Sequence, residues 1–185
     1  KLDDGTEHSL FIPSSAQTGL KLVKGFTVPE NAGADFTIDF DLRKSVHKPG
    51  RSGNDYKLRP ALRLVDNAQV GHIDAEVDGL SACPNGDSDG PAIYVYEGGG
   101  VTADDVDTST DTDTDPVTTA TLTDGDSDST YTGTAGFLAT GTYTVAFTCE
   151  AGNDANDADD GLSFQNETNV DVKAGQTMTY SHTVQ

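Results

Sequence analysis

Hydrophobic and polar residues alternate with a period of two along most of the chain, and this period is typical of half-buried β-strands. The runs 34–46 and 56–65 show it most clearly. Their apolar residues, which should share one buried face in each strand, are Phe36, Ile38, Phe40, Leu42, Tyr56, Leu58, Leu62 and Leu64. Pro60 lies inside the second run, where it predicts an edge position or a bulge because proline cannot donate a ladder hydrogen bond.

Shorter runs of the same kind fill the rest of the chain, separated by turns rich in Gly, Pro, Asn and Asp. They span residues 9–13, 19–28, 70–79, 92–98, 117–123, 130–138, 141–150, 168–175 and 176–185. In the run 141–150, Tyr143, Val145, Phe147 and Cys149 share a face, so Cys149 should point into a core. The pattern predicts an all-β fold of two tandem antiparallel β-sandwich domains.

The distribution of charge suggests where these domains meet. Residues 1–72 contain ten Lys and Arg against nine Asp and Glu, whereas residues 73–185 contain one basic residue, Lys173, against 22 acidic ones. We therefore expect a first domain over residues 1–78 and an acidic second domain over residues 79–185. The net charge of −20 argues against nucleic acid as a partner, because phosphate binding needs clustered Lys and Arg. It favours cation binding or a solvated surface in a salty medium.

The two cysteines, Cys83 and Cys149, lie near the two ends of the acidic half. In a secreted protein they are expected to form a disulfide, which would stabilise the fold by about 4 kcal/mol in the chain-entropy model. The alternative is a pair of reduced, buried thiols in a cytosolic protein. The sequence opens without an initiator Met, a signal peptide or a lipid-attachment Cys, and no apolar run is long enough to span a membrane. We expect a mature portion of a secreted or lipid-anchored precursor.

Four acidic runs are the strongest chemical signal. Calcium takes six to eight oxygen ligands, and alternating Asp and Asn residues around small residues present such oxygens on a tight loop. The candidate ligands are Asn85, Asp87, Asp89, Asp111, Asp113, Asp115, Asp124, Asp126, Asp128, Asn153, Asp154, Asn156, Asp157, Asp159 and Asp160. A disulfide between Cys83 and Cys149 would bring the first and last of these runs together. Solvated acidic turns are the alternative for each run.

Two stretches, "LFIPSSAQTGLKL" and "FTIDFDLRKSV", resemble the later part of a bacterial domain of unknown function, family 4382, over about residues 5–78. Members of that family carry further strands before this point. The resemblance therefore leaves open whether the first domain is complete, and it implies an open sheet edge that another chain could cover. "GFLATGTYTVAF" and "VDVKAGQTMTYSHTV" resemble prealbumin-like and carboxypeptidase-regulatory-like sandwiches, which implies an Ig-like or prealbumin-like second domain. Neither resemblance implies an activity.

The sequence shows no clear catalytic signature. The four histidines show no metal-ligand spacing, and no Gly-x-Ser-x-Gly elbow presents a serine nucleophile. Tyr94 and Tyr96 share a strand face and could form a small platform for a sugar, or a packing pair. We expect a non-enzymatic extracellular or cell-surface protein that is structural or adhesive, stabilised by calcium, and able to assemble with other subunits through a strand edge. A carbohydrate-binding accessory module is the alternative.

Overall fold

The computed structural model describes residues 5–12, 35–47, 56–86, 89–107, 115–155 and 158–185. Its strands are β1 (Leu10–Phe11), β2 (Phe36–Asp41), β3 (Val46–His47), β4 (Tyr56–Leu58), β5 (Ala61–Asp66), β6 (Val70–Asp78), β7 (Ala92–Glu97), β8 (Thr118–Thr121), β9 (Thr130–Ala139), β10 (Gly141–Thr148), β11 (Gln165–Val172) and β12 (Thr177–Thr183). Two short helical turns accompany them, α2 (Leu42–Ser45) and η1 (Leu80–Ala82). The all-β prediction is confirmed, and the expected strand at 19–28 lies outside the described residues.

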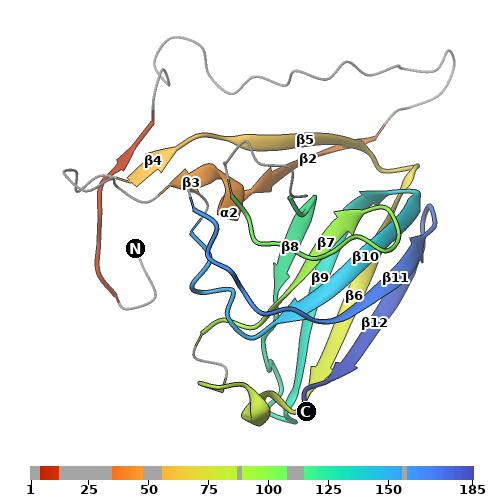
Figure 1. The fold of residues 1–185 in the computed structure, drawn as a ribbon. Coiled ribbons are helices and arrows are strands. Elements are labelled where there is room, and N and C mark those ends of the chain that lie inside the picture. The colour runs from red at the N-terminus through yellow and green to blue at the C-terminus, as the bar shows by residue number, and fades with distance from the viewer. Residues whose placement is uncertain (1–4, 13–34, 48–55, 87–88, 108–114, 156–157) are drawn as a thin grey trace, which may run out of the picture.

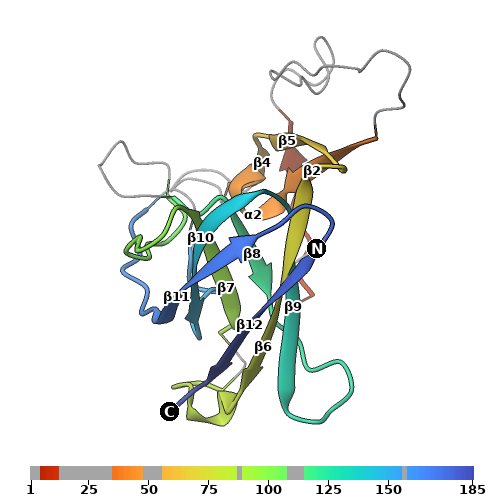
Figure 2. The ribbon, with the colours of Figure 1, turned by 90° about the vertical axis from the view of Figure 1, so that its right-hand side faces the viewer.

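The larger part of the molecule is a sandwich of two sheets. One sheet has the strand order β12-β6-β9, and the other has the order β11-β10-β7-β8. Figure 2 shows the two layers, with β11, β10 and β7 in one and β12, β6 and β9 in the other. Neighbouring strands run antiparallel except β6 and β12, which are parallel. The predicted β-sandwich class is thereby confirmed.

The core between the sheets follows the period of two. On β10 and directly after it, the four residues expected to share an inward face all belong to this core: Tyr143, Val145, Phe147 and Cys149. The residues between them, Thr144, Ala146 and Thr148, are also buried, on the opposite face of the strand. The remaining large core side chains come from both sheets and include Ile73, Val77, Ile93, Val95, Leu138 and Tyr180. Because each buried Val, Leu, Ile or Phe contributes roughly 1.5–3 kcal/mol, this layer is the main source of stability.

Strand β6 belongs to this sandwich, although the charge step places it in the first domain. Its residues pair with β9 on one side and with β12 on the other, so it is the central strand of its sheet. Its inward residues alternate with exposed ones, because only one of its faces packs against the second sheet. Residues 79–185 therefore do not contain all the strands of their own sandwich. The division into two domains stays a prediction.

The N-terminal strands form two small sheets, one of β2 and β5 and one with the order β1-β4-β3. The pairing of β2 with β5 is antiparallel, as expected from the alternation in both runs. Pro60 separates β4 from β5, so the run 56–65 is two strands rather than one. The broken ladder follows from the missing N–H of proline.

The burial expected on β2 is wrong at two positions. Ile38 is 56% exposed, because no second layer covers it among the described residues. Leu42 is 67% exposed, because the strand ends at Asp41 and the chain turns into α2. The Asp41 carboxylate accepts a hydrogen bond from the Lys44 N–H at 3.0 Å, which caps the first turn of the helix.

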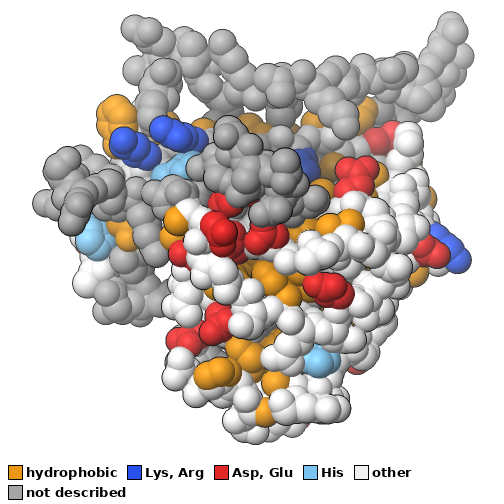
Figure 3. Space-filling model, in the orientation of Figure 1, with side chains coloured by type: hydrophobic (Ala, Val, Ile, Leu, Met, Phe, Trp, Pro, Cys, Tyr) orange, Lys and Arg blue, Asp and Glu red, His pale blue; other side chains and the backbone are white. Residues whose placement is uncertain are grey.

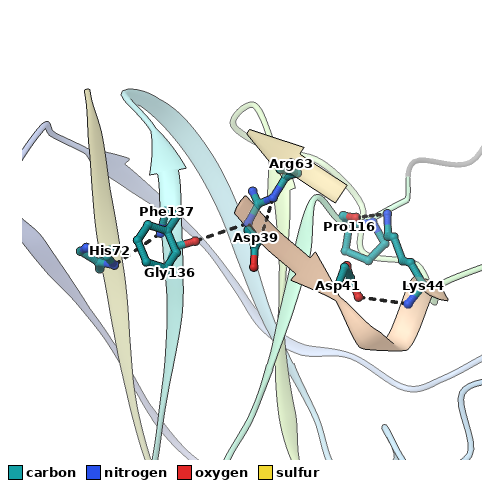
Figure 4. A network of polar contacts seen from close by, with 8 residues as sticks. All are labelled: Asp39, Asp41, Lys44, Arg63, His72, Pro116, Gly136 and Phe137. Atoms are coloured by element: carbon teal, nitrogen blue, oxygen red, sulfur yellow. Dashed lines mark hydrogen bonds and ion pairs between the residues drawn. The ribbon is translucent and has the colours of Figure 1, made fainter. Parts of the chain in front are cut away.

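The β2–β5 sheet lies across one end of the sandwich, as Figure 1 shows. Polar contacts join the two parts in Figure 4. Arg63 of β5 pairs with Asp39 of β2 and also donates to the carbonyl oxygen of Gly136 on β9, at 3.4 Å. The Lys44 ammonium donates to the carbonyl oxygen of Pro116. Within the described part of the chain, no helix is long and apolar enough to cross a membrane.

Candidate metal centre

The candidate centre lies on the outer face of strand β7. Ile93 and Val95 point into the core between the sheets, so Tyr94 and Tyr96 point to the opposite face. That face would be solvated in a simple sandwich, yet both tyrosines are 0% exposed. They belong to a second hydrophobic cluster, whose other members are Ala92, Val101, Ala103, Val106, Ala146, Ala151, Leu162 and Phe164. The loop after β7 and the loop after β10 therefore cover this face.

The two tyrosine hydroxyls reach the acidic residues of these loops. The Tyr94 hydroxyl donates to a carboxylate oxygen of Asp154, and the Phe164 ring packs edge-on against the Tyr94 ring at 5.1 Å between centroids. The Tyr96 hydroxyl donates to the Asp104 carbonyl oxygen and accepts from the Asp104 N–H at 3.0 Å. Burial raises the pKa of Tyr96, so its hydroxyl stays protonated and able to donate. Both tyrosines thus hold the loops in place.

Three carboxylates converge beside these hydroxyls. One oxygen each from Asp104, Asp105 and Asp159 lies within 4.8 Å of the other two. Asp104 and Asp105 come from the loop after β7, and Asp159 comes from the loop after β10. Since 54 positions separate Asp105 from Asp159 in the sequence, only the folded chain brings them together.

Asp105 is the buried member of this group, at 1% exposure. Its Oδ2 accepts a hydrogen bond from the Asp160 N–H at 2.5 Å, and its Oδ1 is buried with no hydrogen-bond partner. Burial raises the pKa of Asp105 to about 6, the Asp160 N–H lowers it, and the negative charges of Asp104, Asp154 and Asp159 raise it further. A buried carboxylate oxygen without a partner is costly, and a cation is one way to satisfy it.

The structure places some of the predicted ligands at the candidate centre and others away from it. From the last run, Asp154 and Asp159 reach the centre, Asp160 contributes its N–H, and Asn153 lies exposed in the adjoining turn. Asp115 is exposed and accepts from the Asp107 N–H at 3.3 Å. Five of the predicted ligands lie outside the described residues: Asp87, Asp111, Asp113, Asn156 and Asp157.

Asp124, Asp126 and Asp128 form a second group of carboxylates within 4.8 Å of one another. Most of this group is exposed. Asp124 accepts from the Ser127 N–H at 2.7 Å, and Asp128 accepts from the Thr130 N–H at 2.8 Å. These bonds stabilise the turn itself. The assignment of Asp124, Asp126 and Asp128 as calcium ligands stays a prediction.

The predicted disulfide and the predicted approach of two acidic loops are both present. Cys83 and Cys149 form a disulfide with a Cα–Cα distance of 5.8 Å. Beyond it, the Gly152 N–H donates to the Asp89 carbonyl oxygen at 2.6 Å. The Asn85 amide donates to the Asp89 carboxylate at 2.5 Å within the first of these loops. The disulfide thus lies at the base of two adjoining loops.

Residues 1–60 match the model of a "Domain of unknown function (DUF4382)". That match confirms the first of the two resemblances over those residues. No curated protein matches the chain. Among solved structures, a crystal structure of a candidate cell adhesion protein from Bacteroides fragilis is similar to 71% of this chain, at 14% identity and a TM-score of 0.27. The similar region spans 45% of the length of that protein.

Asp104 and Asp105 were not among the ligands predicted from the sequence. They lie in the Asp- and Thr-rich tract after β7, where only the regular alternation at 111–115 stood out. The available signal was the apolar Val106 directly after them, which is 2% exposed in the fold and anchors this part of the tract. An apolar residue inside an acidic tract indicates that its neighbours are held against the protein.

The interpretation of Tyr94 and Tyr96 as a sugar platform is wrong. Both rings are 0% exposed, so neither offers a surface on which a sugar could stack. The alternation of β7 correctly placed them on one face, but the covering loops turned that face into a second core. Packing, the other interpretation of this pair, is confirmed.

Proposed function

We propose that this protein is a non-enzymatic, extracellular or cell-surface β-sandwich protein with a structural or adhesive role, stabilised by calcium. The observation that carries the proposal is the pair of acidic loops joined at their base by the Cys83–Cys149 disulfide. Disulfides persist in oxidising compartments such as the cell exterior. Extracellular modules bind calcium with dissociation constants of about 10⁻⁴–10⁻³ M. Together they suit a domain that must keep its shape outside the cell.

The surface supports a cation more than an anionic partner. Figure 3 shows Asp and Glu side chains gathered over the middle of one face, with Lys and Arg side chains mainly along its upper part. Residues 73–185 contain 22 acidic residues and a single basic one. Phosphate groups of nucleic acids or anionic lipids would be repelled by such a surface, whereas divalent cations would be attracted.

Calcium would stabilise the protein by binding its folded loops and not the unfolded chain. A ligand present at 100 times its dissociation constant adds about 2.7 kcal/mol to the free energy of unfolding. For a chain of 185 residues, this corresponds to a rise in the melting temperature of roughly 5–10 °C.

Thermal unfolding tests the proposal. The protein is first freed of metal with a chelator, and its melting temperature is then measured with and without millimolar calcium. We expect a calcium-dependent rise of roughly this size and a clearly smaller one with magnesium, which demands a tighter octahedral site. An unchanged melting temperature in calcium would contradict the proposal. It would leave the acidic runs as a solvated surface suited to a salty medium.

Assembly with a second copy of the chain is a finer part of the same proposal. The exposed large apolar side chains among the described residues all lie in the N-terminal part: Leu10, Phe11, Ile12, Ile38 and Leu42. The β2–β5 sheet has only two strands among these residues, so both of its strands are edges. Light scattering over a range of concentrations tests this part, and a monomer at every concentration contradicts it.

A further inference from the structure

We infer that a single calcium ion binds between Asp104, Asp105 and Asp159 and joins the loop after β7 to the loop after β10. This inference rests on the calcium dependence proposed above and assigns it to one set of ligands. It also excludes the exposed turn at Asp124, Asp126 and Asp128 as the stabilising site.

The distances suit calcium. Calcium binds oxygen ligands at 2.3–2.6 Å, so two oxygens on opposite sides of one ion lie about 5 Å apart. The three carboxylate oxygens lie within 4.8 Å of one another, which allows all of them to contact one ion.

Asp105 distinguishes this group from an ordinary acidic turn. Its side chain is 1% exposed, and the Asp160 N–H holds its Oδ2 in place at 2.5 Å. Its Oδ1 is left buried without a hydrogen bond. Water does not reach this atom, so a bound cation would remove the cost of burying it. In the group at 124–128, by contrast, none of the three carboxylates is buried.

The surrounding contacts fix the ligands before an ion arrives. The Tyr96 hydroxyl holds the backbone of Asp104, and the Asp159 carboxylate accepts from the Gly161 N–H at 3.0 Å. Asp154, bound to the Tyr94 hydroxyl, adds negative charge near Asp105. A site whose ligands are already oriented loses little entropy on binding, which favours affinity.

Terbium offers a direct probe, because it replaces calcium at oxygen sites and its emission is excited by nearby aromatic rings. The chain contains no Trp, so tyrosine is the donor, and Tyr94 and Tyr96 lie beside the proposed ion. We propose titrating the full chain with terbium and displacing it with calcium. The variants are Asp105→Asn, Asp159→Asn and, as the matched control, Asp126→Asn.

We expect Asp105→Asn and Asp159→Asn to weaken calcium binding at least tenfold, and Asp126→Asn to leave it unchanged. Asp159 is exposed, so its variant should fold even if the buried Asp105→Asn does not. Wild-type affinity in the Asp159→Asn variant and in a folded Asp105→Asn variant would overturn the assignment, as would loss of binding in Asp126→Asn. If wild-type protein is stabilised by calcium while these variants bind normally, only the assignment fails. If wild-type protein shows neither binding nor stabilisation, the proposed function fails with it.

Discussion

The Gly152 N–H donates to the Asp89 carbonyl oxygen at 2.6 Å and so joins two acidic loops that are 63 positions apart in the sequence. The contact lies just beyond the Cys83–Cys149 disulfide. A Cβ atom at position 152 would lie only 2.7 Å from the same carbonyl oxygen. Glycine is therefore required here, because any side chain would push the two loops apart.

The substitution Gly152→Ala should destabilise the protein by about 1–3 kcal/mol, since the added methyl group meets backbone atoms that cannot move alone. Urea denaturation measures this loss. Gly125→Ala is the matched control, because a Cβ at position 125 meets no atom within 4 Å. Equal free energies of unfolding for the two variants would contradict this prediction, because they would mean that the two loops leave room for a methyl group at position 152.

Removal of the disulfide in the double variant Cys83→Ala/Cys149→Ala should cost about 4 kcal/mol, because 66 positions separate the two cysteines and the unfolded chain gains freedom. Denaturation with and without a reducing agent measures the effect. The reducing agent should destabilise the wild-type protein and leave the double variant unchanged. Equal stability of the wild-type protein before and after full reduction of its disulfide would contradict this prediction.

In the presence of a chelator, the free energy of unfolding should depend on pH in part through Asp105. Its pKa is raised from 3.8 to about 6 in the folded state, so the folded chain holds this proton more tightly than the unfolded chain does. The contribution is fully present below about pH 4 and is lost as the pH rises through about 6. In chelator, wild-type protein should therefore gain stability relative to Asp105→Asn as the pH falls from 7 to 4. A constant difference between the two proteins would contradict the raised pKa.

Arg63 should couple the β2–β5 sheet to the sandwich. Its guanidinium pairs with Asp39 and donates to the Gly136 carbonyl oxygen, and the pair is partly exposed. Arg63→Ala should cost about 0.5–1 kcal/mol in urea denaturation, the usual range for partly exposed pairs. The exposed Arg59 serves as the control, and its change to alanine should have a smaller effect. A double-mutant cycle with Asp39→Ala then isolates the energy of the pair.

The strands of the sandwich could be predicted from the sequence because their signal is local. On β10, alternation alone identified the face that packs into the core between the sheets, which contains Val145 and Phe147. The disulfide also followed from the sequence, since a chain with two cysteines has one pairing available. The same local pattern was wrong about Ile38, because burial needs a second layer as well as an apolar face.

The alternation and the two cysteines by themselves determined the sandwich and its disulfide. Only the tertiary structure decided which carboxylates meet. Period two assigns Tyr94 and Tyr96 to one face of β7 but does not tell whether loops will cover that face. The covering loops bring Asp105 to Asp159 and bury Asp105 to 1% exposure. Whether these two residues lie together depends on the path of both loops in three dimensions. A local stretch of sequence does not determine that path.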